Sequence, residues 1–186
     1  MALLDSKKLP LGADCPDFDL INVDGSRVKR DDFKGKKVLL VVFTCNHCPY
    51  AVAVEDRIAQ LGREYGYNRN FAMVAIQPND PNIVAADSLD NMQMRAEEKD
   101  FRFPYLWDET QDAARAFDAV CTPEFYLFDA DRKLVYHGRL DDNWQDPSKV
   151  TRRELKEAID LLLEGKQPPT QQYPSMGCSI KWREQT

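Results

Sequence analysis

Residues 38–49 read Val-Leu-Leu-Val-Val-Phe-Thr-Cys-Asn-His-Cys-Pro. The apolar part, Val38 to Phe43, is rich in β-branched residues and does not alternate with polar ones, which is typical of a strand covered on both faces of a sheet. Apolar residues then recur at helical spacing at Val54, Ile58, Leu61 and Tyr65. The sequence therefore predicts a central strand that passes into a helix, with two cysteines at the junction.

The two cysteines at this junction are Cys45 and Cys48. The first turn of a helix has unpaired backbone N–H groups and a partial positive charge, and both favour a thiolate over a thiol. Residues three apart lie on one face of a turn, so a disulfide between the two sulfurs needs only a modest local adjustment. The pair is therefore predicted to be redox-active.

The residues beside these cysteines bear on which sulfur attacks. A protonated His47 would add a positive charge that lowers the pKa of a nearby thiol, although a merely solvated histidine is the alternative. Pro49 lacks the N–H that would bond the carbonyl of Cys45, so the first turn is irregular if Cys45 is the N-cap. If the helix begins at Pro49, Cys48 is the N-cap and is as well placed to attack. We favour Cys45 as the nucleophile and keep Cys48 as the alternative.

The rest of the chain alternates strand and helix patterns. Asp24-Gly25 favours a hairpin turn between residues 18–23 and 27–33. The run from Phe71 to Ile76 follows the first helix as a strand, which predicts a right-handed βαβ unit with parallel strands. Further strands are predicted at 105–107, 125–129 and 134–137, and further helices with Ser88 and Thr110 as N-caps and with an apolar stripe from Leu155 to Leu163. This order predicts an α/β fold with a mixed central sheet and helices on both faces.

Length and composition indicate one domain over residues 1–186, with residues 166–186 as a C-terminal tail. The chain has 186 residues, 43% of them hydrophobic, which is enough for one core. A net charge of −6 without a basic block argues against a nucleic-acid partner. No apolar run approaches the roughly 20 residues of a membrane span, and Met1 to Lys8 lacks the apolar core of a signal peptide, so we expect a cytoplasmic protein without a membrane partner.

The five cysteines are an odd number, so at least one thiol stays free. In a reducing compartment a close pair is more often catalytic or metal-binding than structural. A zinc site would need further ligands from His47, His137, Cys121 or Cys178, and the sequence has no second closely spaced pair. An inert pair is disfavoured because the ends of core strands in α/β sheets are where ligands bind. Catalysis is therefore the favoured interpretation.

Several motifs of the chain resemble those of thioredoxin-fold redoxins. They are, in chain order, Asp14-Cys15-Pro16-Asp17-Phe18, Gly35-Lys36-Lys37, Cys45-Asn46-His47-Cys48-Pro49-Tyr50, Thr122-Pro123-Glu124, Gly138-Arg139-Leu140-Asp141-Asp142 and Gly177-Cys178-Ser179-Ile180-Lys181-Trp182. The resemblance is most specific to the peroxiredoxin-like branch of alkyl hydroperoxide reductases and thiol-specific antioxidant proteins. It implies a thioredoxin-like fold with an N-terminal hairpin and a peroxiredoxin-type insertion between Ser88 and Trp107.

The resemblance also implies roles for residues outside the cysteine pair. The Thr122–Pro123 bond would be cis and face the active cysteines, and its backbone would align an extended partner chain for disulfide exchange. Cys121 would lie nearby, either as a spare redox thiol or as a small buried apolar residue. The tail belongs to the recurring pattern, so Cys178 is a candidate resolving thiol if the tail docks rather than frays. Cys15 is expected to be incidental.

The sequence departs from two better-known redoxin patterns. The peroxidatic signature has a threonine three residues before its cysteine, and Val42 stands at that position before Cys45. Thioredoxins carry a buried carboxylate on the strand before their cysteine pair, and here that strand has no charge. Peroxide binding of the usual kind is therefore not predicted, and another base must move the proton.

Four polar residues are candidates for the missing roles. His47, Asp141 and Asp142 are the candidate bases. The two aspartates can take this role if the loop after the last strand folds back toward the cysteines. Arg139 would hold a thiolate or an anionic substrate, or else form an exposed ion pair.

The main hypothesis is a thiol-disulfide oxidoreductase in which one thiolate, preferably Cys45, attacks a partner disulfide and Cys48 resolves the mixed disulfide. The first alternative is a thiol peroxidase that reduces hydroperoxides, with Cys48 or Cys178 condensing with the sulfenic acid. The second alternative is a soft-metal carrier that holds copper or zinc with Cys45, Cys48 and a histidine. The expected partners are protein disulfides or peroxides and a reducing thiol protein. No cofactor is expected, and the sequence leaves the oligomeric state open.

Overall fold

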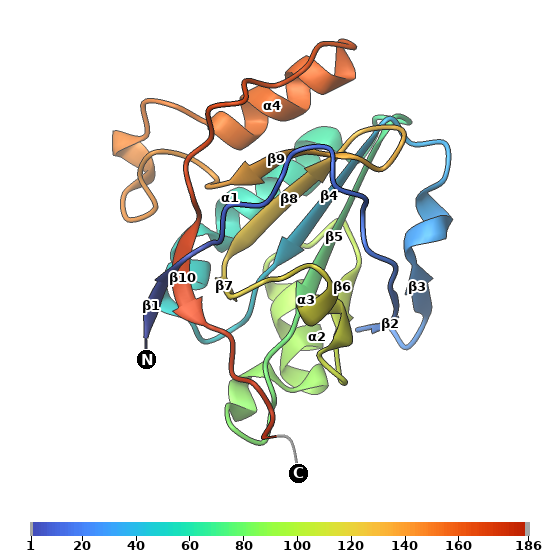
Figure 1. Ribbon diagram of the computed structural model, residues 1–186. Helices are drawn as coiled ribbons and strands as arrows, with labels where there is room; N and C mark the ends of the chain where they lie inside the picture. The colour runs from blue at the N-terminus through green and yellow to red at the C-terminus, as the bar shows by residue number, and fades with distance from the viewer. Residues whose placement is uncertain (1, 185–186) are drawn as a thin grey trace.

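The computed structural model describes residues 2–184 (Figure 1). The strands are β1 (Leu3–Asp5), β2 (Asp19–Asn22), β3 (Arg27–Lys29), β4 (Val38–Phe43), β5 (Phe71–Gln77), β6 (Tyr105–Trp107), β7 (Cys121–Thr122), β8 (Glu124–Phe128), β9 (Leu134–Gly138) and β10 (Met176–Ser179). The α-helices are α1 (Pro49–Tyr65), α2 (Leu89–Glu98), α3 (Asp112–Ala116) and α4 (Glu154–Leu163). Short 3-10 helices are η1 (Arg30–Phe33), η2 (Ala85–Asp87) and η3 (Pro147–Lys149).

A mixed sheet with the strand order β3-β2-β6-β5-β4-β8-β9 forms the centre of the molecule. β4 pairs in parallel with β5 and antiparallel with β8, so the predicted central strand has a partner on each side. β5 and β6 are also parallel, whereas β2, β3 and β9 pair antiparallel with their neighbours. A smaller sheet with the order β1-β10-β7 lies beside it. The predicted mixed sheet is confirmed.

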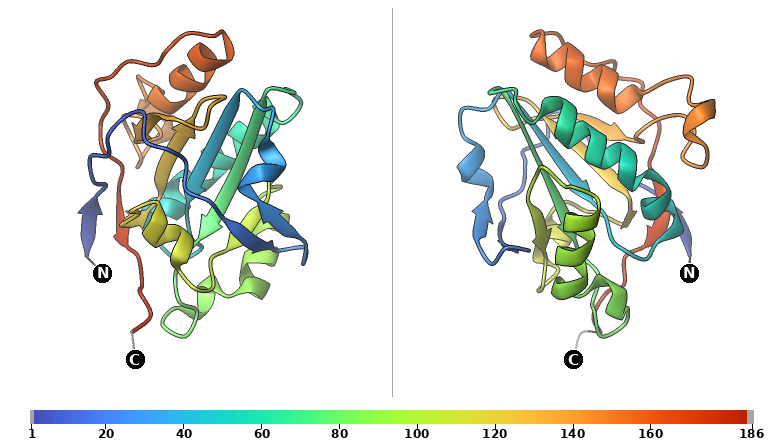
Figure 2. Two further views of the ribbon diagram at one scale, coloured as in Figure 1. Left: turned by 45° about the vertical axis from the view of Figure 1, so that its right-hand side comes forward. Right: turned by 180° about the vertical axis from the view of Figure 1, so that it is seen from behind.

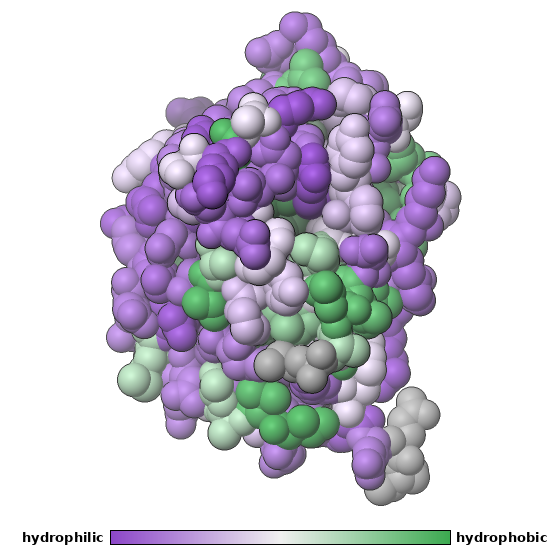
Figure 3. Space-filling view, turned by 90° about the vertical axis from the view of Figure 1, so that its left-hand side faces the viewer, coloured by the Kyte–Doolittle hydropathy of each residue, from purple (hydrophilic) through white to green (hydrophobic). Residues whose placement is uncertain are grey.

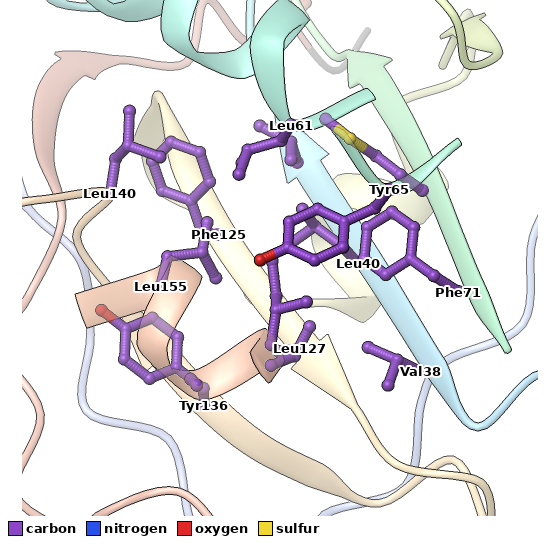
Figure 4. Packing of buried hydrophobic residues seen from close by; sticks show 14 of the residues in the cluster. Val38, Leu40, Leu61, Tyr65, Phe71, Phe125, Leu127, Tyr136, Leu140 and Leu155 are labelled. Atoms are coloured by element: carbon purple, nitrogen blue, oxygen red, sulfur yellow. The ribbon is translucent and has the colours of Figure 1, made fainter. Parts of the chain in front are cut away.

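The core has two halves because successive side chains of β4 point to opposite faces of the sheet. On one face Leu40 packs with Phe125 of β8 and Leu155 of α4 (Figure 4). On the other face Phe43 packs edge-on against Phe117, which follows α3, with ring centroids 5.3 Å apart. Figure 2 shows α1, α2 and α4 on one face and α3 on the other, which confirms the predicted helices on both faces.

The N-terminal hairpin is confirmed with shorter strands than predicted. β2 and β3 pair antiparallel around Asp24-Gly25, and Gly25 has a φ of 84°, which glycine adopts without strain. The segment Arg30–Phe33, predicted as part of the second strand, is the 3-10 helix η1. The hairpin therefore ends at Lys29.

The predicted N-caps have different outcomes. The side chain of Ser88 accepts a hydrogen bond from the Asn91 N–H and caps α2 as predicted. The cap predicted at Thr110 is wrong, because α3 begins at Asp112. The carboxylate of buried Asp108 accepts from the N–H groups of Ala113 and Ala114 at 3.3 and 2.8 Å. An ionised carboxylate at the start of a helix is a stronger acceptor than a hydroxyl, and it reaches this position from the preceding turn.

The C-terminal tail docks over the length that the structure describes. Its strand β10 lies between β1 and β7 and is antiparallel to both, and neither β1 nor β10 was predicted. Ile180 is buried and Trp182 half-buried in the α3 side of the core, and these two side chains anchor the tail. Between residues 2 and 184, no helix combines the length and the apolar character needed to cross a bilayer.

Candidate active site

Cys45 lies in the loop that leaves β4, and Cys48 is the N-cap of α1. Pro49 is the first helical residue, and the carbonyl oxygen of Cys48 accepts from the Val52 N–H at 2.9 Å. Of the two helix starts considered, the one at Pro49 is therefore correct. It gives Cys48 rather than Cys45 the position at the positive end of the helix.

Thr122 contacts both sulfurs of the pair. Its hydroxyl oxygen lies 3.1 Å from the sulfur of Cys45, and its carbonyl oxygen lies 3.2 Å from the sulfur of Cys48. The Thr122–Pro123 peptide bond is cis, as the resemblance implied. The residue before the cis proline thus faces the cysteine pair.

Cys178 completes a cluster of three thiols. It pairs with Thr122 across β10 and β7, and it packs with Cys45, Cys48 and Ala51 in one buried apolar cluster. The exposed fractions are 4% for Cys45, 0% for Cys48 and 3% for Cys178, and all five cysteines of the chain are free thiols. The docked tail therefore brings the predicted third cysteine to the pair and covers it.

The surroundings of the three thiols make their acidities very different. The pKa of Cys48 falls from 9.0 to about 5, because its sulfur accepts hydrogen bonds from the Cys45 and Cys178 thiols and from the backbone N–H groups of Ala51 and Cys178. The Thr122 carbonyl opposes ionisation, since it can only accept, but these donors outweigh it. Burial raises the pKa of Cys45 well above its ordinary value, and the neighbouring Cys48 and Asp87 raise it further. Burial also raises the pKa of Cys178, to about 12.

His47 belongs to a buried polar pair rather than to the solvated surface. Its Nδ1 lies 2.6 Å from Oδ2 of Asp87, whose exposed fraction is 0%. The other carboxylate oxygen of Asp87 accepts from the Asn46 N–H at 2.8 Å, and the Asn79 amide donates to Oδ2 at 2.8 Å. Among residues 2–184, Nε2 of His47 is buried without a hydrogen-bond partner. The interpretation of His47 as merely solvated is therefore wrong.

Asp87 is a site residue that the sequence analysis missed. It ends the 3-10 helix η2 within the polar stretch Gln77–Asp87, which carries one other acidic residue, Asp80. Only the fold brings η2 against the loop that carries the cysteines. No spacing in the sequence distinguishes Asp87 from its neighbours.

Glu124 supplies the buried carboxylate that β4 lacks. It lies on β8 opposite Phe43, the last residue of β4, and its exposed fraction is 0%. One oxygen is bonded to the Tyr126 hydroxyl at 2.7 Å and to Nε2 of His137 at 2.8 Å. The other accepts from the Cys121 N–H at 3.2 Å. The neighbouring strand, rather than the strand before the pair, therefore brings a carboxylate to this end of the sheet.

The two remaining cysteines are buried outside the three-thiol cluster. Burial and the Glu124 charge raise the pKa of Cys121, so that thiol stays neutral. Burial raises the pKa of Cys15 to about 12, and Cys15 lies in the α3 side of the core. Both have the character of small apolar residues.

The acidic and basic residues after β9 make other contacts. Arg139 donates to Glu154 at 3.0 Å through Nε, and its guanidinium lies over the Tyr173 ring. Asp141 is paired with Arg57, and Asp142 accepts from Thr151. In the portion of the chain that the structure describes, none of the three contacts a cysteine. The arrangement matches the ion-pair interpretation of Arg139.

The side chains that could hold a metal ion differ from the expected set. One ligand atom each from Cys45, His47 and Asp87 lies within 4.8 Å of the others, so a carboxylate stands where Cys48 was expected. The imidazole and carboxylate already bond each other, which satisfies both without an ion. The donor set is harder than a soft metal prefers.

Two solved structures and one curated protein illustrate what this chain is similar to. A solved structure of an uncharacterized conserved protein from Geobacillus kaustophilus is 43% identical, covers 100% of this chain and 99% of its own, and superposes with a TM-score of 0.94. A hypothetical protein from Sinorhizobium meliloti is 37% identical, with coverages of 96% and 98% and a TM-score of 0.91. The thiol-disulfide oxidoreductase ResA of Bacillus thuringiensis is 21% identical over 131 residues, which are 69% of each chain.

A sequence family covers most of the chain. The AhpC/TSA family model matches residues 11–137, which include the central strand, the cysteine pair and the cis proline. The match confirms the resemblance to thioredoxin-fold redoxins and the thioredoxin-like fold predicted from it. The chain belongs to the AhpC/TSA family.

Proposed function

We propose that this protein is a cytoplasmic thiol-disulfide oxidoreductase in which Cys48 is the attacking sulfur. The observation that carries the proposal is the position of Cys48 at the start of α1, where donors around the sulfur lower its pKa to about 5. A thiolate is the nucleophile in disulfide exchange, and Cys48 is ionised at neutral pH whereas Cys45 is not. This reverses the preference for Cys45 drawn from the sequence.

The reaction takes place in two exchanges. The Cys48 thiolate attacks one sulfur of a partner's disulfide, which forms a mixed disulfide and releases the partner's other sulfur as a thiolate. Cys45 then loses its proton and attacks the sulfur of Cys48, which forms the Cys45–Cys48 disulfide and releases the partner's second thiolate. The partner is reduced by two electrons, and a reducing thiol protein restores the pair by the reverse steps.

The second exchange needs a base, because Cys45 is neutral. The pair of His47 and Asp87 lies beside it, with ligand atoms within 4.8 Å of the Cys45 sulfur. Asp87 fixes the ring through Nδ1 and leaves Nε2 without a partner within the described residues. We therefore assign His47 as the proton acceptor and Asp87 as the residue that positions it.

Two variants test the order of attack. Cys48→Ser should abolish reduction of oxidised glutathione, whereas the double variant Cys45→Ser/Cys178→Ser should stop at a mixed disulfide between glutathione and Cys48 that mass spectrometry detects. Cys15→Ala, which removes a buried thiol from the opposite side of the sheet, is the control and should keep full activity. A mixed disulfide on Cys45 in the Cys48→Ser variant would assign the attack to Cys45 and reject the proposal.

Peroxide reduction is the second candidate, and the burial of the site favours it. Exposed fractions of 0% for Cys48 and 4% for Cys45 admit a small oxidant more easily than a protein. In this version the Cys48 thiolate attacks a hydroperoxide oxygen, releases an alcohol or water and becomes a sulfenic acid, with which Cys45 or Cys178 condenses. Stopped-flow mixing of reduced protein with hydrogen peroxide measures the rate, and a rate like that of free cysteine rejects this candidate.

The soft-metal carrier is the third candidate. Its test is metal analysis of the protein purified without a chelator, compared with the Cys48→Ser variant. A stoichiometric metal that the substitution removes would support the carrier, and an ion that persists in Cys48→Ser would assign binding to Cys45, His47 and Asp87 instead.

A further inference from the structure

Strand β10 occupies the free edge of β7, directly beside the cis proline. Cys178 pairs with Thr122 and Ser179 with Cys121, in antiparallel register. Segments on both sides hold the strand in place: Ser6 donates its N–H to the Ser175 carbonyl at 2.8 Å, and Lys181 donates its N–H to the Asn79 side chain at 2.8 Å. An extended peptide that adds to a sheet edge makes contacts of this kind.

The strand also places a cysteine against the attacking sulfur. The side chain of Cys178 packs with that of Cys48 in the same buried cluster. Cys48 thus shares one buried cluster with two other thiols, Cys45 from the preceding loop and Cys178 from β10.

Gly177 is the residue that lets β10 approach so closely. A Cβ atom at this position would lie 2.0 Å from the Thr122 carbonyl oxygen and 3.1 Å from the nitrogen of Pro123. Both are backbone atoms, which cannot rotate away as a side chain can. A strand in this register therefore needs glycine immediately before its cysteine.

We infer that β10 occupies the position at which a partner chain binds, and that Cys178 is an internal redox partner of Cys48. An external chain must therefore displace β10 and bind in its place with a Gly-Cys segment of its own. The inference rests on the proposed function and adds to it the substrate class, an extended chain with glycine before the reacting cysteine. β1 lies on the outer side of β10, and Leu3 and Leu4 of β1 are exposed. Figure 3 shows hydrophobic residues gathered on this face, where an incoming chain would arrive.

The internal exchange needs no added oxidant once the pair is oxidised. Cys178 loses its proton and attacks the Cys48 sulfur of the Cys45–Cys48 disulfide. The Cys48–Cys178 bond forms, the Cys45–Cys48 bond breaks, and Cys45 leaves with the electron pair and takes up a proton. One disulfide is exchanged for another, and the new one ties β10 over the site.

Disulfide mapping is the first test. The full chain is equilibrated in glutathione buffers of graded potential, trapped with acid and an alkylating reagent, and digested for mass spectrometry. The expected result is two single-disulfide species, Cys45–Cys48 and Cys48–Cys178. If Cys178 is alkylated at every potential while Cys45–Cys48 forms, the inference is overturned and the proposed function stands. If Cys48 forms no disulfide at all, both are rejected.

Access to Cys48 is the second test. Gly177→Ala should push β10 off β7 and speed the alkylation of reduced Cys48 by N-ethylmaleimide by at least about tenfold, since closure of the strand then no longer limits access. Ser179→Ala, on the same strand, adds no atom against Thr122 and should react like the parent chain. Equal rates in the two variants would overturn the inference.

A pair of peptides tests the substrate class directly. The peptides Met-Gly-Cys-Ser-Ile-Lys and Met-Ala-Cys-Ser-Ile-Lys are presented as mixed disulfides with glutathione to the full-length Cys178→Ser chain. The glycine peptide should be reduced about tenfold faster, because alanine collides with the backbone at Thr122. Equal rates for the two peptides would remove the Gly-Cys requirement.

Discussion

The carbonyl oxygen of Thr122 lies 3.2 Å from the sulfur of Cys48. The same residue brings its hydroxyl to Cys45 and its backbone to Cys178, so it touches or pairs with all three thiols of the cluster. Thr122 stands before a cis proline at the end of β7. A residue distant in sequence from both cysteines therefore contacts both of their sulfurs.

The first prediction concerns the hydroxyl of Thr122. This hydroxyl lowers the pKa of Cys45, so Thr122→Val should raise that pKa further and slow the step in which Cys45 attacks the mixed disulfide. The measurement is the decay of a preformed mixed disulfide between Cys48 and glutathione, followed by mass spectrometry. Thr122→Ser keeps the hydroxyl and should restore the rate. Equal decay in Thr122→Val and the parent chain would show that the hydroxyl has no part in this step.

The second prediction is the pH dependence of alkylation. The pKa of Cys48 is about 5, below the ordinary 9.0, and the thiolate is the reactive form. The alkylation rate of Cys48 should therefore rise with pH up to about pH 6 and stay level to about pH 9. Cys45, whose pKa is raised, should become reactive only in strongly alkaline solution. The check is peptide mapping after brief iodoacetamide treatment at graded pH, and a rise centred near pH 9 for Cys48 would contradict the assignment.

The third prediction concerns Asp87→Asn. The negative charge of Asp87 raises the pKa of Cys45, so removing the charge should let Cys45 ionise and react at lower pH. Asparagine has one acceptor oxygen where aspartate has two, so at least one of the buried bonds to Asn46, His47 or Asn79 is lost, which should lower the free energy of unfolding by about 1–3 kcal/mol. Alkylation profiles and urea unfolding measure the two effects. Asp90→Asn, at an exposed position in the first turn of α2, is the control.

The central part of the fold could be predicted from local patterns. β4 is recognisable because an apolar run without alternation is found where a sheet is covered on both faces, and the helix after it has an apolar stripe. β1 and β10 could not be recognised in this way. Met176–Ser179 contains glycine, cysteine and serine, and it forms a strand only because β1 and β7 lie on either side of it.

The site could be predicted where it is continuous in the sequence. Cys45, His47 and Cys48 stand together, and the cis proline and Cys178 followed from a resemblance. Asp87 was missed because it reaches the site from another element, η2. Glu124 was missed because it lies on β8 rather than on the strand before the cysteine pair, and a buried carboxylate looks like any surface carboxylate in a sequence. The sequence left the choice between Cys45 and Cys48 open for a related reason. The proposed attack by Cys48 depends on donors from Ala51 and Cys178 that only the folded chain assembles.

The fourth prediction concerns the buried carboxylate of Glu124. Its charge raises the pKa values of both Cys121 and Tyr126, so Glu124→Gln should lower both and make Cys121 easier to alkylate at alkaline pH. The glutamine has one acceptor oxygen for groups that now bond two, namely Tyr126 and His137 on one side and the backbone of Cys121 on the other. The free energy of unfolding should fall by about 1–3 kcal/mol, measured by urea denaturation.

Glu109→Gln is the control, because it removes the same charge from an exposed position. It should change the free energy of unfolding by less than about 0.5 kcal/mol and should leave the alkylation of Cys121 unchanged. The alkylation of Cys48 provides the contrast within the same samples. Its pKa is set by thiol and backbone donors, none of which comes from Glu124, so its profile should not move. A shift of the Cys48 profile in Glu124→Gln would instead assign Glu124 a direct electrostatic part in ionising the attacking sulfur.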